Sequence, residues 1–200
     1  MFANPVNGRQ SPRSRLAAIA LVVVGAVVLS TATVLGLHWA TASSRKAPAM
    51  AQSGQLGFTK LHRQAPALLM PSLRGPGAVS VAKLAGKPIV LNFWASTCEV
   101  CKSETPALAS AARALGGKVT FVGIDSVDRH GPAMAFITKY HVPYPVGFDP
   151  QGTLAIKYGV IALPVTVFLS PSGKTIVGEN IGALTRSSLR TILHNLYGTA

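Results

Sequence analysis

Apolar and polar positions along the chain form segments that predict alternating strands and helices. Apolar runs indicate strands at residues 88–95, 118–125, 144–149 and 165–170. Helices are expected at residues 98–115, 132–140, 153–158 and 185–196. A last strand at 175–180 is expected to pair back onto the strand before it. This alternation predicts an α/β domain with a mixed central sheet that is flanked by helices.

The segment ahead of these elements predicts an extra N-terminal β-hairpin. Two short apolar stretches, at residues 65–73 and 78–81, surround the turn-forming sequence Arg74-Gly75-Pro76-Gly77. Residues 39–64 are rich in Ala, Ser, Gln and Gly, a composition typical of a flexible tether. We therefore expect the folded domain to occupy residues 65–200.

A long apolar segment near the N-terminus predicts a membrane anchor. Residues 16–37 contain no charged residue and no proline over 22 positions, and about 20 apolar residues suffice to cross a bilayer as a helix. Arg9, Arg13 and Arg15 precede the segment, which favours a cytoplasmic tail at residues 1–15. We expect a single transmembrane helix at 16–38, with the domain on the periplasmic or extracytoplasmic side of the cytoplasmic membrane.

A cleaved signal peptide is the alternative interpretation of this segment. The sequence Ala40-Thr41-Ala42 offers a cleavage site, although the apolar core of a signal peptide, about 7–15 residues, is shorter than this one. A buried core helix fits less well, because the segment is apolar on every face and has polar flanks. Either a membrane anchor or a signal peptide places the domain outside the cytoplasm.

Charge changes this picture little. The formal net charge is +13, from 19 Lys and Arg against 6 Asp and Glu. The basic residues are spread singly, without a basic helix or a patch interleaved with aromatic residues, so no nucleic-acid partner is expected. We interpret the charge as a solvated basic surface.

The two cysteines of the chain point to redox chemistry. Cys98-Glu99-Val100-Cys101 lies between the strand predicted at 88–95 and the following helix, and a CxxC at such a junction is typical of thioredoxin-like redox proteins. A helix N-terminus stabilises an anionic sulfur through its unpaired N–H groups. We expect Cys98 to face solvent and attack a substrate disulfide, and the more buried Cys101 to resolve the mixed disulfide.

A structural bridge and a metal-binding pair are the alternatives for these cysteines. Zinc takes four ligands, and the chain has no second cysteine pair. Its histidines lie scattered at His38, His62, His130, His141 and His194. We expect neither a metal nor another cofactor.

The order of several short motifs resembles that of the TlpA-like proteins, a branch of the thioredoxin superfamily. These proteins are membrane-tethered thiol-disulfide oxidoreductases, and they include cytochrome c biogenesis thioredoxins. The resemblance covers about residues 65–196. The motifs that carry it are Ala65-Pro66, Gly86-Lys87-Pro88, Leu91-Asn92-Phe93-Trp94-Ala95-Ser96, the CxxC, Glu104-Thr105-Pro106, Tyr158-Gly159-Val160-Ile161-Ala162-Leu163-Pro164 and Ser170-Pro171-Ser172-Gly173-Lys174.

The resemblance implies a thioredoxin-like fold and assigns roles to several residues. Cys98 and Cys101 would form the redox-active disulfide. Glu104 would be an acid near the buried thiol. These three residues are the expected catalytic residues. A surface glutamate near the helix N-terminus is the alternative for Glu104. Pro164 is implied to be a cis-proline, or else an ordinary proline at the start of a strand.

Four residues are expected to contact the substrate: Trp94, Thr97, Leu163 and Pro164. Leu163 would present its backbone to an extended substrate chain. The sequence departs from the family pattern at Thr97, where the family usually has Trp, and in the dipeptide Glu99-Val100, which lacks a proline. The charge of Glu99 is expected to oppose the helix-dipole effect on Cys98.

The function that follows is reduction of disulfides in exported client proteins, such as apocytochrome c. The reducing power would come from a thiol-electron donor in the membrane. A non-catalytic metal-handling or redox-sensing module on the same fold is one alternative, and a peroxiredoxin-type peroxidase is another.

Overall fold

The computed structural model describes residues 57–199. The predicted cytoplasmic tail, the transmembrane helix at 16–38 and the tether up to residue 56 lie outside the described residues. Within residues 57–199, none of the helices has the length and apolar character that a membrane span requires.

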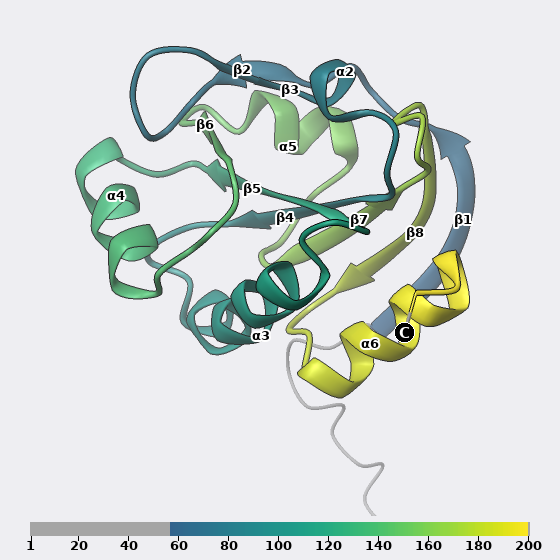
Figure 1. Ribbon diagram of the computed structural model, residues 1–200. Helices are drawn as coiled ribbons and strands as arrows, with labels where there is room; N and C mark the ends of the chain where they lie inside the picture. The colour runs from purple at the N-terminus through teal and green to yellow at the C-terminus, as the bar shows by residue number, and fades with distance from the viewer. Residues whose placement is uncertain (1–56, 200) are drawn as a thin grey trace, which may run out of the picture. The chain divides into compact units, whose positions relative to one another are not determined.

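Six strands form the central sheet, in the order β1-β8-β7-β4-β5-β6 (Figure 1). Their bounds along this order are β1 Gly57–Gln64, β8 Thr175–Ile181, β7 Val165–Leu169, β4 Ile89–Trp94, β5 Thr120–Ser126 and β6 Val146–Asp149. β4, β5 and β6 run parallel, whereas β7 is antiparallel to β4, and β8 and β1 continue the sheet in antiparallel fashion. The predicted mixed α/β sheet is confirmed.

Helices and a small second sheet cover the two faces of this sheet. α3 (Glu99–Leu115), α4 (His130–Lys139) and α6 (Arg186–Tyr197) pack on one face. The other face is covered by α2 (Val81–Leu84), α5 (Thr153–Tyr158) and the two-stranded antiparallel sheet of β2 (Leu69–Pro71) and β3 (Ala78–Ser80). The strands between the two layers supply alternate side chains to each, and every residue of β4 is buried.

β2 and β3 occupy the segment that was expected to form a hairpin, and they contact β6 closely. Met70 of β2 pairs with Val79 of β3, and the Met70 side chain lies directly over Gly147. A side chain at position 147 would collide with Met70. Glycine at that position therefore lets the small sheet pack on the central one.

The prediction of a flexible tether at residues 39–64 is wrong for its last eight residues. Residues 57–64 form β1, which pairs with β8 from Gly57 opposite Ile181 to Gln64 opposite Thr175. Phe58 packs edge-on against Phe168 of β7, with ring centroids 5.9 Å apart. β1 lies at the edge of the sheet and remains mostly exposed, so its sequence carries no long apolar run. The domain includes these residues.

Candidate functional site

The two cysteines lie at the N-terminus of α3 and form a disulfide, with Cα atoms 5.3 Å apart. Cys98 is the N-cap residue, and its Sγ accepts a hydrogen bond from the N–H of Cys101 at 3.1 Å. Cys98 is half-buried, whereas Cys101 is fully buried. The structure therefore confirms the predicted difference in accessibility between the two sulfurs.

The carboxyl end of β4 brings several predicted substrate contacts together. Thr97 is exposed in the loop that leads from β4 to Cys98. Val165, the first residue of β7, pairs with Phe93 of β4, which places Leu163 and Pro164 at the same edge of the sheet. The Leu163–Pro164 peptide bond is cis, as the resemblance implied.

Trp94 differs from the expectation that it contacts the substrate. Its side chain is only 3% exposed and stacks on Phe136 of α4, with ring centroids 4.3 Å apart. Because Trp94 ends β4, this packing holds the carboxyl end of β4 against α4 and keeps the indole away from solvent.

Glu104 is buried one helical turn after Cys101 on α3, with 1% of its surface exposed. Oε1 accepts a hydrogen bond from Nδ2 of Asn92 at 2.7 Å, and Oε2 accepts one from the N–H of Leu184 at 3.0 Å. Asn92 Nδ2 also donates to Thr166 Oγ1 at 3.1 Å. The alternative of a surface glutamate is therefore wrong.

Burial raises the pKa of Glu104 to about 7, against the opposing effect of its hydrogen bonds from Leu184 and Asn92. Desolvation disfavours the charged form of a carboxyl group. A carboxyl group with this pKa exchanges its proton near neutral pH. Since Cys101 and Glu104 are three residues apart on one helix, their side chains are neighbours.

A second buried acid, Asp125, lies near the end of β5 and was not among the predicted site residues. Asp125 pairs with Trp94 across the sheet and is fully buried. Burial, followed by the negative charges of Asp128 and Asp149, raises the pKa of Asp125 to about 8. Asp125 is therefore protonated at neutral pH.

Sequence reasoning also missed Asp128, which holds the Cys98 loop. Its Oδ2 accepts a hydrogen bond from the N–H of Ser96 at 2.6 Å, and its Oδ1 accepts one from the N–H of Arg129 at 2.7 Å. Partial burial raises the pKa of Asp128, but the hydrogen bonds from Ser96 and Arg129 outweigh it and bring the pKa below its usual value. The parallel course of β4 and β5 was the available signal, because it places the loops that follow them at one edge.

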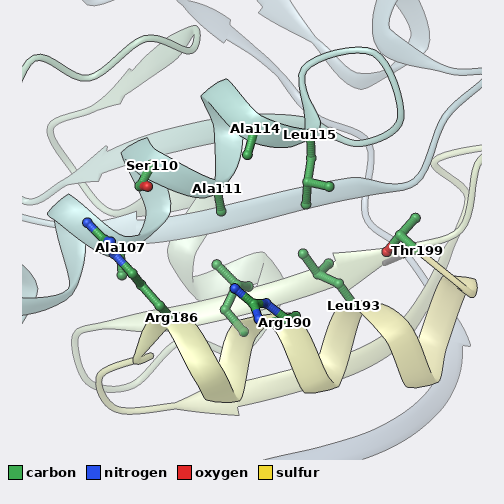
Figure 2. Close-up of a pocket in the computed structure, with 10 residues that line it drawn as sticks. Ala107, Ser110, Ala111, Ala114, Leu115, Arg186, Arg190, Leu193 and Thr199 are labelled. Atoms are coloured by element: carbon green, nitrogen blue, oxygen red, sulfur yellow. The ribbon is translucent and has the colours of Figure 1, made fainter.

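A cavity of about 470 Å³ lies between α3 and α6, and none of the predicted site residues lines it (Figure 2). Arg186 and Arg190 of α6 lie at this cavity beside the small side chains of α3. In the part of the chain that the structure describes, no three His, Cys, Asp or Glu side chains form a group that could hold a metal ion.

Comparison with known proteins agrees with this geometry. The model of the AhpC/TSA family matches residues 61–177. The chain belongs to this family. Among solved structures, the chain is similar to a secreted Mycobacterium tuberculosis disulfide oxidoreductase that is homologous to DsbE of E. coli. The TM-score is 0.59 at 30% identity, and the match covers 64% of this chain and 96% of that one.

Curated relatives carry names of the same enzyme class. The thiol:disulfide interchange protein DsbE of Pseudomonas fluorescens biotype C is 32% identical over 109 residues, which are 54% of this chain and 60% of that protein. A DsbE homolog of Paracoccus denitrificans is 34% identical, covering 62% of this chain and 68% of that one. The thiol-disulfide oxidoreductase ResA of Bacillus cereus is 26% identical, and the match covers 72% of this chain and 90% of that protein. With the Cys98–Cys101 pair, these relatives identify a thiol-disulfide oxidoreductase of the DsbE/ResA type with a thioredoxin-like fold.

The raised pKa of Asp125 predicts that stability falls as pH rises. Between about pH 4 and pH 8, Asp125 is protonated in the folded protein and ionised in the unfolded chain, so unfolding releases a proton and becomes easier at higher pH. In the Asp125→Asn variant, the side chain at position 125 has no proton to release on unfolding. We expect it to raise the free energy of unfolding at pH 8 by roughly 2–4 kcal/mol, since each unit of pKa difference corresponds to about 1.4 kcal/mol.

Urea unfolding at pH 5, 6.5 and 8 measures this effect, with Glu179→Gln on β8 as the control for loss of one acid. The control should keep the pH slope of the wild type, whereas Asp125→Asn should flatten it. Equal slopes in the wild type and Asp125→Asn would contradict the assignment. Some slope should remain, because Glu104 acts in the same direction between about pH 4.5 and pH 7.

Proposed function

We propose that this protein reduces disulfides of exported proteins outside the cytoplasm, with Cys98 as the nucleophile and Cys101 as the resolving thiol. The observation that carries the proposal is the geometry of the pair. Cys98 caps α3 at the surface and accepts the N–H of Cys101, while Cys101 is fully buried behind it. Only the first sulfur is open to a substrate as large as another polypeptide.

The reaction proceeds in two exchanges. In the reduced protein, the Cys98 thiolate attacks one sulfur of the client disulfide and forms a mixed disulfide, and the other client sulfur leaves as a thiolate and takes up a proton. Cys101 then loses its proton and attacks the Cys98 sulfur, which closes the Cys98–Cys101 disulfide and releases the second client thiol. Two electrons and two protons pass from the protein to the client.

The helix end favours the first exchange. Unpaired N–H groups at the N-terminus of α3, the N–H of Cys101 among them, stabilise negative charge on the Cys98 sulfur. Glu99 was expected to oppose this effect, but its carboxylate pairs with Lys102 one turn along the helix. The ion pair offsets part of the negative charge next to Cys98.

Glu104 serves the second exchange. Its carboxylate, held in place by Asn92 and Leu184, takes the proton of Cys101 when that thiol attacks. A pKa of about 7 suits both uptake and release of this proton near neutral pH. Thr97 and the Leu163 backbone contact the client chain beside Cys98, whereas Pro164 and Trp94 are buried.

The location and partners complete the proposal. Residues 16–38 anchor the protein in the cytoplasmic membrane, a thiol-electron donor in that membrane reduces the Cys98–Cys101 disulfide, and exported proteins such as apocytochrome c are the clients. The names of the DsbE and ResA relatives support the thiol-disulfide chemistry of this proposal. A relative named soluble secreted antigen MPT53, 35% identical over 109 residues, supports the alternative of a cleaved N-terminal segment.

Serine variants of the two cysteines test the assigned roles. We expect Cys98→Ser to lower reduction of a disulfide-bonded peptide to the uncatalysed rate, because the attacking sulfur is gone. Cys101→Ser should stop at the mixed disulfide, which mass spectrometry detects as a peptide adduct on Cys98. Wild-type turnover in Cys98→Ser would refute the proposal.

The proton role of Glu104 predicts a change in the pH profile. In single-turnover reaction of the reduced protein with a chromogenic aromatic disulfide, the second thiolate release reports attack by Cys101. The wild-type rate of this phase should rise through about pH 7 as Glu104 ionises. Glu104→Gln should lose this inflection and slow the phase about 10- to 100-fold above pH 7. Glu179→Gln should behave as the wild type, and an inflection retained in Glu104→Gln would exclude the role.

A further inference from the structure

Val127, directly after β5, combines two unusual properties. Its φ is 54°, in the left-handed region that a β-branched residue adopts only as an outlier. Its side chain is 70% exposed, although it is wholly apolar. Such strain persists only where the surroundings enforce it, and it is concentrated at functional sites.

Contacts on both sides of Val127 enforce this conformation. The N–H of Val127 donates to the carbonyl oxygen of Asp149 at 3.0 Å. The next residue, Asp128, accepts the N–H of Ser96 at 2.6 Å. Opposite Val127, a Cβ at Gly152 would lie 2.8 Å from Val127 Cγ2, so glycine at 152 leaves the space that the valine occupies. The turn is therefore tied to the Cys98 loop on one side and fitted to the β6–α5 loop on the other.

The order of the strands places Val127 at the same edge of the sheet as the redox pair, directly after the strand next to the one that leads to Cys98. The sheet runs β7-β4-β5 (Figure 1), and the Cys98 loop leaves the carboxyl end of the middle strand. The segment that ends in the cis Leu163–Pro164 bond lies on the β7 side of this loop, and Val127 lies on the β5 side. The β7-side segment also projects an apolar side chain, Ile161, which is 93% exposed.

We propose that Val127 is a specificity-determining contact for the client polypeptide, on the side of Cys98 opposite Ile161 and Pro164. The inference rests on the proposed function and names the client chemistry: an extended chain with an apolar side chain close to its reacting cysteine. Exposed apolar surface on both flanks of Cys98 gains contact when such a chain lies across the loop. The hydrogen bond between Asp128 and Ser96 fixes the position of Val127 relative to the loop that carries Cys98.

Two synthetic peptides with one intramolecular disulfide test the proposal, one with leucine and one with serine next to the reacting cysteine. The measured quantity is the ratio of the second-order rate constants with which the full-length reduced protein reduces the leucine peptide and the serine peptide in a single turnover. Val127→Asn keeps a residue that tolerates the left-handed conformation but removes the apolar surface. We expect it to lower the ratio about three- to tenfold, as loss of one small apolar contact does.

Val127→Gly should lower the ratio in the same way. It should not lower the unfolding temperature, because glycine adopts a positive φ without strain. Ile156→Ser serves as the matched control, since Ile156 is 75% exposed on α5 with ordinary helical backbone and should keep the wild-type ratio. An unchanged ratio in both Val127 variants would overturn the inference, as would equal losses with both peptides. If the wild type reduced neither peptide, the proposed function itself would fail.

Discussion

The redox site depends on the hydrogen bonds that the buried carboxyl group of Glu104 accepts. Its oxygens accept hydrogen bonds from Asn92 on β4 and from the backbone of Leu184 ahead of α6, so one side chain joins the helix that carries the cysteines to the sheet and to the next helix. A buried polar group without partners is costly, and these bonds therefore favour a single position of α3. The same burial raises the pKa of Glu104 to about 7, which suits the proton transfer that we propose for this carboxyl group beside Cys101.

Acidic residues are scarce in this chain, and most of them lie around the cysteines. The chain has 6 Asp and Glu against 19 Lys and Arg, yet Asp125, Asp128 and Asp149 all lie at the carboxyl ends of β5 and β6. Their environments give them different states and tasks. Burial keeps Asp125 protonated, backbone N–H groups keep Asp128 ionised so that it holds the Cys98 loop, and Asp149 accepts the N–H groups of Leu154 and Ala155 at the start of α5.

Local patterns predicted most elements, and long-range pairing accounts for what they missed. β4 and α3 follow from an apolar run and from a helix that begins at Cys98, and the structure places both within two residues of the expected bounds. β1 was missed because an edge strand is stabilised by β8, more than a hundred residues later, and not by its own sequence. The CxxC identified the redox pair locally, whereas the buried position of Glu104 depends on Asn92 of β4 and on Leu184 ahead of α6, which are distant along the chain. Val127 could not be predicted, because valine disfavours the left-handed backbone that the folded loop imposes on it.

The most direct measurement for this account is the titration of Glu104 itself in the oxidised protein, followed by the chemical shift of its ¹³C-labelled side-chain carboxyl carbon. We expect a midpoint at about pH 7, well above that of an ordinary glutamate at about 4.3. A midpoint near the ordinary value would mean that Glu104 is ionised throughout the neutral range, and it would contradict the role of this carboxyl group as the proton acceptor for Cys101.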